Sequence, residues 1–327
     1  MATGKALVIT ASGGTDVFKV IPDYSFPAPQ EGEVLVKLIA TSVNPVDVYV
    51  RTGTYASPTF PKIIGGDLSG HVHALGPGVT SKFSVGQPVY GLSDAYVPYS
   101  KYEGTYAEYA VVKEEWLAHA PTSLPLAASA GVPLVYLTAL QALEKAEPKA
   151  GQRILVLGAS GGVGQFGVQL GKLMYNLHVT AASSAKNADL VTSLGADEVW
   201  DYSAGPAGLE ETYGSAPFDI IFDVVGGELL DASAKTLVQG GVITHIMNRG
   251  TQGADKVYRE AFEAGTGPKF ETTLVKPDGK GLEEAAKLFN SGKITLKVAL
   301  ELPVEEAGKA HDIVIDGHAG GKVVLTI

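Results

Sequence analysis

The chain has 327 residues, which at about 150 residues per domain is enough for two domains. Hydrophobic residues make up 45% of it and charged residues 18%, and this composition excludes an intrinsically disordered chain. The formal net charge of −10 disfavours a nucleic acid or an anionic membrane as a partner. Because the chain has no cysteine, disulfides, thiol nucleophiles and Cys-ligated zinc are excluded as well.

The first 112 residues predict a compact, largely antiparallel β domain. Short runs rich in β-forming residues, separated by turns of proline and glycine, occur at 6–10, 34–40, 70–75 and 106–112. Ahead of them, residues 1–5 lack the basic and then apolar layout of a secretion signal, which predicts an intracellular and most simply a cytoplasmic protein. We interpret the histidines as structural or exposed rather than as metal ligands, namely His71, His73, His311 and His318.

Residues 124–143 form a stretch of twenty residues without a charge, which is long enough to cross a bilayer. Pro125, Gly131 and Pro133 interrupt this stretch, and three polar side chains lie within it. We therefore expect two short buried helices at a domain junction, and no transmembrane segment.

From residue 153 onward the pattern changes to alternating strands and helices. Residues 154–157 form a continuous apolar run, as in a strand covered on both faces, and apolar residues then recur at helical spacing up to residue 174. Repeated β–α units of this kind predict an α/β protein with a doubly wound parallel sheet. Further strands are predicted at 178–182, 198–200, 218–225 and 242–247, and helices near 186–194 and 229–238.

The last part of the chain completes the predicted domains. Beyond residue 270 we expect another strand, a helix around 281–290 and a terminal strand at 322–327 that returns to the first domain. This predicts that residues 1–125 and 273–327 form the first, β-rich domain and that residues 126–272 form the second domain.

A glycine-rich turn, residues 158–164, lies between the first strand and the first helix of the second domain. A dinucleotide pyrophosphate must approach bare backbone at the positive end of a helix, and a side chain at Gly161 or Gly162 would block that approach. Gly164 would let the helix pack close to the sheet. The alternative is a tight turn without a ligand. The predicted cofactor-binding residues of this turn are Ser160, Gly161, Gly162, Val163 and Gly164.

The end of the next strand predicts which nicotinamide cofactor is bound. In NAD sites an acid about twenty residues after the glycine turn holds the ribose 2′-hydroxyl. Here the residues are Ser183, Ser184 and Lys186, and no carboxylate occurs before Asp189. Hydroxyls and a lysine suit a 2′-phosphate, so NADPH is favoured over NADH. The alternative is that Lys186 is an ordinary solvated lysine at the start of a helix.

The order of a β domain, a nucleotide-binding sheet and a return strand resembles the medium-chain dehydrogenase/reductase superfamily over nearly the whole chain. The resemblance implies a GroES-like catalytic domain and a Rossmann domain. In zinc-dependent relatives a Cys stands at the place of Asn44 and a His at the place of Gly66, and neither residue present here replaces those ligands. The chain resembles the zinc-free quinone oxidoreductase branch through residues 44–47, 65–67, 158–164, 194–199, 201–202 and 315–322.

The resemblance also implies the residues that line the substrate site. Asn44 and Asp47 would lie near the nicotinamide, and Tyr49 and Tyr55 would flank the substrate, where a tyrosine offers a flat face and a hydroxyl for a developing oxyanion. The alternatives are that Asn44 and Pro45 start a turn and that Tyr49 is a partly exposed surface aromatic. Several plant alkenal reductases of this branch carry a Lys in place of Tyr49, so substrate preference does not carry over.

Three further positions are implied as cofactor contacts. Thr138 resembles the family threonine that hydrogen-bonds the nicotinamide amide, with a bond to its own helix backbone as the alternative. Tyr202 resembles the family tyrosine beside the adenosine phosphate, with a core or surface aromatic as the alternative. Gly241, which follows Gly240, allows either close approach of the cofactor or a cap on the preceding helix.

These residues together predict an NADPH-dependent, zinc-independent oxidoreductase that transfers hydride to a small quinone or to an α,β-unsaturated carbonyl, an enone or alkenal. The alternatives are a 2-enoyl-thioester reductase and a non-catalytic, crystallin-like NADPH-binding protein. The resemblance implies a homodimer, paired through the strand near 270–275. It leaves peripheral membrane contact open, and a location at the plastid envelope or stroma beside the cytoplasm.

Overall fold

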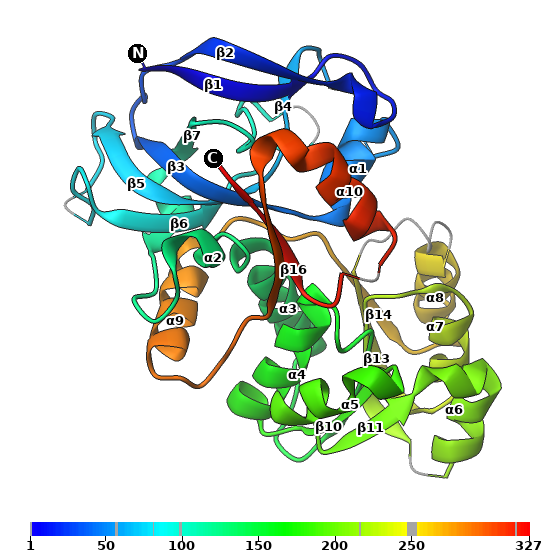
Figure 1. Cartoon of the computed structure of the whole chain (residues 1–327). Helices are drawn as coiled ribbons and strands as arrows, with labels where there is room; N and C mark the ends of the chain where they lie inside the picture. The colour runs from blue at the N-terminus through cyan, green and yellow to red at the C-terminus, as the bar shows by residue number, and fades with distance from the viewer. Residues whose placement is uncertain are drawn as a thin grey trace. The chain divides into compact units, whose positions relative to one another are not determined.

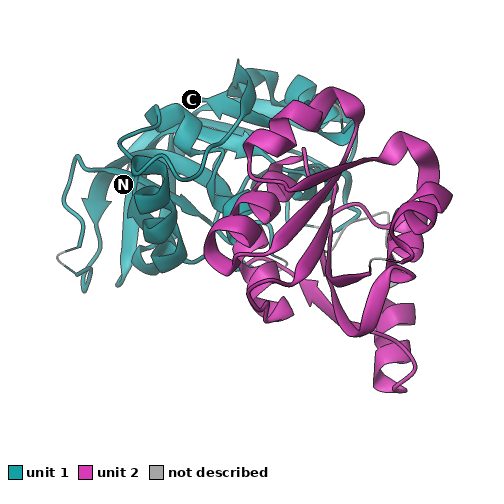
Figure 2. Cartoon of the chain, turned by 90° about the horizontal axis from the view of Figure 1, so that it is seen from below, with its two compact units in different colours: residues 1–137, 276–327 teal, residues 138–275 magenta. Residues whose placement is uncertain are grey.

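The computed structural model describes residues 2–55, 58–80, 82–97, 100–215, 217–246, 254–317 and 319–327. The chain divides into two compact units, which Figure 2 shows in different colours. Unit 1 comprises residues 1–137 and 276–327, and unit 2 comprises residues 138–275. The first boundary lies further along the chain than the expected boundary between residues 125 and 126.

Strands dominate unit 1 (Figure 1). They are β1 (Ala2–Ile9), β2 (Phe18–Phe26), β3 (Glu33–Val43), β4 (Lys62–Ile63), β5 (Asp67–Leu75), β6 (Pro88–Leu92), β7 (Tyr109–Lys113), β8 (Leu117–His119), β15 (Val298–Pro303) and β16 (Lys322–Thr326). A 3-stranded sheet has the order β2-β1-β4, and a 7-stranded sheet has the order β15-β16-β3-β5-β6-β8, with β7 also paired to β3. Among the described strands of this unit only β15 and β16 pair in parallel, so the predicted antiparallel β domain is confirmed.

The core of unit 1 lies against β3 and β5. Val34, Val36 and Leu38 of β3 alternate along one face and pack with Leu68 and Val72 of β5. The terminal strand β16 pairs antiparallel with β3, which confirms its predicted return to the first domain. The helices of this unit are α1 (Pro45–Thr52), α2 (Leu126–Ser129), α9 (Gly279–Asn290), α10 (Ala307–Ile315) and the first part of α3 (Pro133–Ala146).

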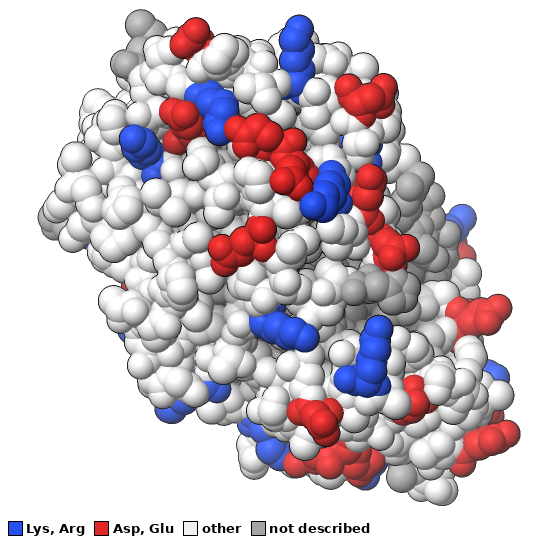
Figure 3. All heavy atoms as spheres, viewed as in Figure 1, with Lys and Arg blue, Asp and Glu red and all other residues white. Residues whose placement is uncertain are grey.

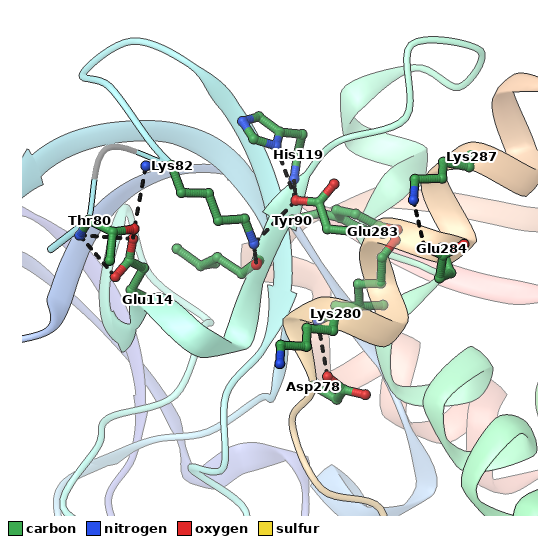
Figure 4. A network of polar contacts seen from close by, with 12 residues as sticks. Thr80, Lys82, Tyr90, Glu114, His119, Asp278, Lys280, Glu283, Glu284 and Lys287 are labelled. Carbon is green, nitrogen blue, oxygen red and sulfur yellow. Dashed lines mark hydrogen bonds and ion pairs between the residues drawn. The ribbon is translucent and has the colours of Figure 1, made fainter.

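Polar contacts fasten the returning helix α9 to β8 (Figure 4). His119 Nδ1 lies 3.0 Å and Lys82 Nζ lies 3.2 Å from the same carboxylate oxygen of Glu283. A Cβ on Gly279 would lie 2.3 Å from the carbonyl oxygen of Leu117, so glycine permits this close approach. The segment after unit 2 is therefore an integral part of unit 1.

Residues 126–146 are, within the described chain, the one helical stretch long and apolar enough to span a membrane. In the structure 83% of the most apolar window of this stretch is buried, as in the core of a folded domain. A break at residues 130–132 separates α2, with 4 residues, from α3, with 14. The two predicted buried helices are confirmed, although α3 is not short. Location and peripheral membrane contact stay predictions.

Unit 2 is a 6-stranded sheet in which every described strand pair is parallel, so the predicted parallel sheet is confirmed. Its order is β11-β10-β9-β12-β13-β14. Strand β14 lies at the edge of this sheet, and pairing of two chains through it stays a prediction. The elements are β9 (Arg153–Leu157), α4 (Gly162–Tyr175), β10 (His178–Ser183), α5 (Ala188–Ser193), β11 (Glu198–Asp201), α6 (Gly205–Tyr213), β12 (Phe218–Asp223), α7 (Gly227–Ala234), β13 (Leu237–Ile246), α8 (Ala254–Glu263) and β14 (Lys269–Thr273).

One predicted helix of unit 2 ends earlier than expected. The helix expected near 229–238 ends at Ala234, because Leu237 already pairs with Phe218 of β12. Gly240 has a φ of +79° and lies within β13. The alternative that Gly240 and Gly241 cap the preceding helix is therefore wrong.

The charged side chains are mixed on the face that Figure 3 shows. Lysine and arginine side chains lie among aspartates and glutamates there, and the described residues form no continuous basic field on this face. This face offers a nucleic acid no extended site for its phosphates.

Candidate functional site

The glycine-rich turn of unit 2 brings backbone close to backbone between β9 and α4. Gly158 has a φ of +71°, which favours glycine, and α4 begins at Gly162 after Gly161 as N-cap. A Cβ on Gly164 would lie 2.1 Å from the carbonyl oxygen of Gly158 and 2.8 Å from the Cα of Ala159. Only glycine fits at position 164, and its absence of a side chain lets the helix start close to the turn.

Gly161 differs from Gly164 because the fold itself does not demand a glycine there. Its backbone is extended, with φ −76° and ψ 170°, and a Cβ would meet only the carbonyl oxygen of Gly158, at 3.3 Å. Within the described chain no side chain caps α4, and the buried Gln165 beside the turn has an amide oxygen without a hydrogen-bond partner. A helix N-terminus without a side-chain cap leaves backbone N–H donors for the pyrophosphate of a dinucleotide, whereas the Gln165 oxygen is itself an acceptor and adds nothing to the binding of an anion.

Asn187 links the glycine-rich turn to the end of β10. Its Nδ2 donates to Ser160 Oγ at 3.1 Å and to Ser184 Oγ at 3.2 Å. One amide therefore holds the two loops together. Asn187 was not among the residues predicted from the sequence. Its backbone N–H donates to the Ser184 carbonyl, and this Ser-x-x-Asn turn is the local signal that identifies it.

The end of β10 carries an exposed cation. Lys186 is exposed, whereas Ser183 is buried and its hydroxyl donates to the next carbonyl at 3.3 Å. Asp201, at the end of the neighbouring strand β11, accepts from the Ser203 N–H, and backbone hydrogen bonds of this kind hold its pKa below the usual range. Lys186 is exposed and is therefore accessible to an anionic ligand.

Of the other three predicted cofactor residues, Tyr202 follows the carboxyl end of β11, where Asp201 pairs with Ser183, so it lies at the same edge of the sheet as the loop after β10. Tyr202 is 44% exposed just after β11, and Thr138 is buried in α3. Gly241 lies in β13, where a Cβ would be 2.6 Å from the Cγ of Leu237 and 2.9 Å from the carbonyl oxygen of Asp219. Backbone packing accounts for a glycine at 241. This position is near the amino ends of the paired strands, whereas the glycine-rich turn follows the carboxyl end of β9.

In unit 1 the predicted residues Asn44 and Asp47 form the start of α1. Asn44 is the N-cap, its side chain accepts from the backbone of Asp47, and its own N–H donates to Asp47 Oδ2 at 2.8 Å. Each residue is 1% exposed. The segment therefore begins a helix with a capping box, and neither side chain faces solvent.

Asp67, at the start of β5, is the centre of a buried polar network. Its Oδ2 accepts from Ser42 Oγ at 2.5 Å and from Asn44 Nδ2 at 2.8 Å, and its Oδ1 accepts from the Leu134 N–H at 2.7 Å. Lys322 of β16 places its Nζ 2.7 Å from Asn44 Oδ1 and 3.8 Å from Asp67 Oδ2. The lysine thus supplies positive charge beside buried carboxylates.

Burial raises the pKa of Asp47 from 3.8 to about 7. The Asn44 N–H works against this rise, the Asp67 carboxylate adds to it, and the Lys322 ammonium opposes it. Desolvation also lowers the pKa of Lys322. Asp47 therefore gains or loses a proton near neutral pH, where an ordinary aspartate is ionised.

Asp47→Asn is expected to change how stability depends on pH. The pKa of Asp47 is higher in the folded chain than in the unfolded chain, so the folded state binds more protons from about pH 4 to 7 and loses stability as the pH rises through that range. Relative to the variant, the wild type should lose about 2–3 kcal/mol between about pH 5 and 8 in urea denaturation. A difference between the two proteins that does not change with pH would contradict the raised pKa.

The tyrosines beside this network include one that the sequence did not indicate. Tyr49 in α1 and Tyr55 just beyond it are half-buried, and burial raises the pKa of Tyr55, so its hydroxyl keeps its proton at neutral pH. Tyr96 is 3% exposed, and a Cβ on Gly66 would lie 3.0 Å from its Cδ1. Burial, followed by the charge of Asp67, raises the pKa of Tyr96. Tyr96 therefore occupies the space above Gly66.

In the described ranges no three His, Asp or Glu side chains are grouped so that they could hold a metal ion. Asn44 is bonded to Asp67, and Gly66 packs against Tyr96. His311 is buried in α10, and His318 lies outside the described residues.

Two family models match the chain, an alcohol dehydrogenase GroES-like domain over residues 30–122 and a zinc-binding dehydrogenase over residues 194–325. With this fold and these matches, the chain belongs to the medium-chain dehydrogenase/reductase superfamily and has quinone oxidoreductases among its relatives. It is an oxidoreductase of the kind that uses a nicotinamide cofactor and a small-molecule substrate.

Individual relatives agree with this class. Over 98% of its length the chain is 32% identical to an NADPH-dependent alkenal/one oxidoreductase, chloroplastic, of Arabidopsis thaliana, 79% of which is covered. It is 33% identical to the chloroplast envelope quinone oxidoreductase homolog of the same plant, with 91% of each chain covered. The solved structure of the quinone oxidoreductase from Coxiella burnetii matches with a TM-score of 0.87 and 26% identity over 100% of both chains. The family predicted from the motifs is confirmed.

Proposed function

We propose that this protein transfers hydride from NADPH to quinones or to α,β-unsaturated carbonyls without zinc. The observation that carries the proposal is the bare turn at Gly161, joined through Asn187 to a strand end that carries the exposed Lys186. A pyrophosphate fits the turn, and a 2′-phosphate suits the cation and the nearby hydroxyls. Relatives named for alkenal/one and quinone oxidoreduction support the class of acceptor.

The side chains of unit 1 have a limited task in such a reaction. A nicotinamide bound to the chain would supply the hydride, and a conjugated acceptor stabilises the resulting charge without a Lewis acid. Tyr49 and Tyr55, half-buried, are proposed to position the acceptor and to donate a hydrogen bond or a proton to its oxygen. Asn44 and Asp47, which are buried, are proposed to support α1 from inside unit 1.

Lys186→Ala is expected to weaken the binding of NADPH about tenfold and to leave the binding of NADH unchanged, since only NADPH carries a 2′-phosphate. Dissociation constants for both cofactors, measured by fluorescence titration at low salt, provide the test. Lys235→Ala removes another exposed lysine of unit 2, 63% exposed, and should change neither constant. Equal losses for NADPH and NADH in Lys186→Ala would contradict this role.

Tyr49→Phe and Tyr55→Phe, made separately, test the proposed donors. The variant that lacks the donating hydroxyl should lose about 100-fold in kcat with little change in the dissociation constant of NADPH. Tyr109→Phe, which removes a hydroxyl in β7, serves as the control and should behave as the wild type. Unchanged turnover in both test variants, on every acceptor tried, would remove the tyrosines from the reaction.

One assay separates the proposed function from its two rivals. The absorbance of NADPH is followed with 9,10-phenanthrenequinone, with an alkenal and with crotonyl-coenzyme A in parallel. Turnover of the quinone or the alkenal is the expected result. Turnover of crotonyl-coenzyme A alone would assign an enoyl-thioester reductase, and binding of NADPH without any turnover would assign a non-catalytic protein.

A further inference from the structure

Hydrogen bonds link three buried polar side chains in a row inside unit 1. Arg51 in α1, Tyr106 in the loop before β7 and His311 in α10 are 4%, 0% and 0% exposed. Arg51 Nε donates to His311 Nδ1 at 3.2 Å, and the Tyr106 hydroxyl lies 2.9 Å from His311 Nε2. Arg51 Nη1 also donates to the Gly13 carbonyl at 2.6 Å, so the guanidinium is held at both ends.

The chemistry of the three side chains determines which group donates in each hydrogen bond. A guanidinium can only donate, so His311 Nδ1 must accept and carries no proton. Burial, together with the charge of Arg51, lowers the pKa of His311 to about 3, so the ring is neutral and its proton lies on Nε2. Nε2 then donates to the oxygen of Tyr106. The hydroxyl proton of Tyr106 is left for another acceptor.

Asp47 offers that acceptor. Its Oδ2 accepts from the Asn44 N–H, whereas its buried Oδ1 has no hydrogen-bond partner in the described part of the chain. A side-chain hydrogen bond between the Tyr106 hydroxyl and the Asp47 carboxyl is among the causes that lower the pKa of Asp47 and raise the pKa of Tyr106. We propose that Arg51, His311 and Tyr106 form a relay whose last donor, the Tyr106 hydroxyl, binds Asp47 Oδ1 and sets the proton state of that carboxyl.

The relay acts among other groups that face Asp47. The Asp67 carboxylate of β5 disfavours ionisation of Asp47, and the Lys322 ammonium of β16 favours it. Burial, and after it charges that include those of Asp67 and Asp47, raise the pKa of the Tyr96 hydroxyl. The relay differs from these groups because a neutral hydroxyl donor favours the ionised carboxyl without adding a charge. Its removal should therefore leave Asp47 protonated up to a higher pH.

The consequence for activity rests on the proposed function. Tyr49 follows Asp47 by two residues in α1, so a change of charge at Asp47 occurs within the segment proposed to hold the acceptor. Arg51, His311 and Tyr106 are accordingly positioning residues, which act on the site through Asp47.

A carbon-13 NMR titration of the full-length protein, labelled at the aspartate carboxyl carbons and free of cofactor and substrate, tests the relay. Asp47→Asn identifies the Asp47 signal. Tyr106→Phe is expected to raise the pKa of Asp47 by about one pH unit, because it removes a hydrogen bond to the charged form. Tyr90→Phe, which removes another fully buried hydroxyl bonded to the Leu282 carbonyl, should leave that pKa unchanged.

Substitutions of His311 provide a second route. His311→Gln keeps an amide N–H near the place of Nε2 and should titrate like the wild type, whereas His311→Leu should raise the pKa of Asp47. An unchanged pKa in Tyr106→Phe would overturn the relay, and if that variant does not fold, an unchanged pKa in His311→Leu would do so. The titration needs no turnover, so its failure is distinct from failure of the substrate assay, which tests the proposed function.

Discussion

Lys322→Met is expected to lower the stability of unit 1 by about 3–5 kcal/mol. The lysine is 5% exposed, and its Nζ donates to the Val43 carbonyl and to the Asn44 amide oxygen and lies 3.8 Å from Asp67. Methionine keeps the apolar stem but not the ammonium charge. The buried carboxylate of Asp67, and that of Asp47 where it is ionised, would then lose the charge that offsets them, and an uncompensated buried charge is costly.

Tryptophan fluorescence during urea denaturation can report on unit 1 alone. The chain has 2 tryptophans, Trp116 in unit 1 and Trp200 in unit 2, so a Trp200→Phe background isolates the first. Lys293→Met, which removes an exposed lysine, should leave the midpoint unchanged. Adding Asp67→Asn to Lys322→Met should cost less than the sum of the two single changes. A wild-type midpoint for Lys322→Met would contradict the charge network.

Gly161→Ala is expected to weaken the binding of NADPH by about 100-fold or more while the protein still folds. The backbone at Gly161 is extended, and the added methyl would meet one carbonyl oxygen at 3.3 Å. The same methyl would occupy the place where a pyrophosphate approaches the helix. Gly164→Val should instead damage folding as well as binding, because its Cβ would lie 2.1 Å from the Gly158 carbonyl oxygen.

Gly171→Ala provides the matched control for these two variants. Gly171 lies in the same helix α4, and a Cβ there would make ordinary contacts at 3.6 Å or more. The change should leave the binding of NADPH unaltered and stabilise the helix by up to about 1 kcal/mol. Thermal denaturation and NADPH fluorescence measure the two properties separately. If Gly161→Ala binds NADPH like the wild type, the pyrophosphate does not approach the backbone at Gly161.

The fold of unit 2 was predictable because its signals are local. The apolar run at 154–157 became β9, since a strand covered on both faces needs an apolar side chain at every position. Prediction failed where glycine and proline begin a helix, as in α6, because those residues are more typical of turns. It failed again at residues 237–238, where the apolar spacing of α7 continues into β13.

The candidate site also has a part that local sequence signals predict and a part that they do not. The cofactor turn could be predicted because its glycines lie within one short segment, 158–164, whereas the network of unit 1 depends on contacts between distant segments. Lys322 is hydrogen-bonded to Asn44, 278 residues earlier in the sequence, and His311 to Arg51, 260 residues earlier. These pairs come together because β16 and α10 return to unit 1. The sequence indicated Asn44 but not its direction, which the capping box of α1 turns inward.

Unit 2 is proposed to build a dinucleotide site suited to a 2′-phosphate from a bare turn and an exposed lysine, and fluorescence titration of the wild-type protein with NADPH and, in parallel, with NADH tests this. We expect saturable binding of NADPH, at one site per chain, about tenfold or more tighter than that of NADH. Absence of saturable binding, or equal affinity for NADH, would contradict it.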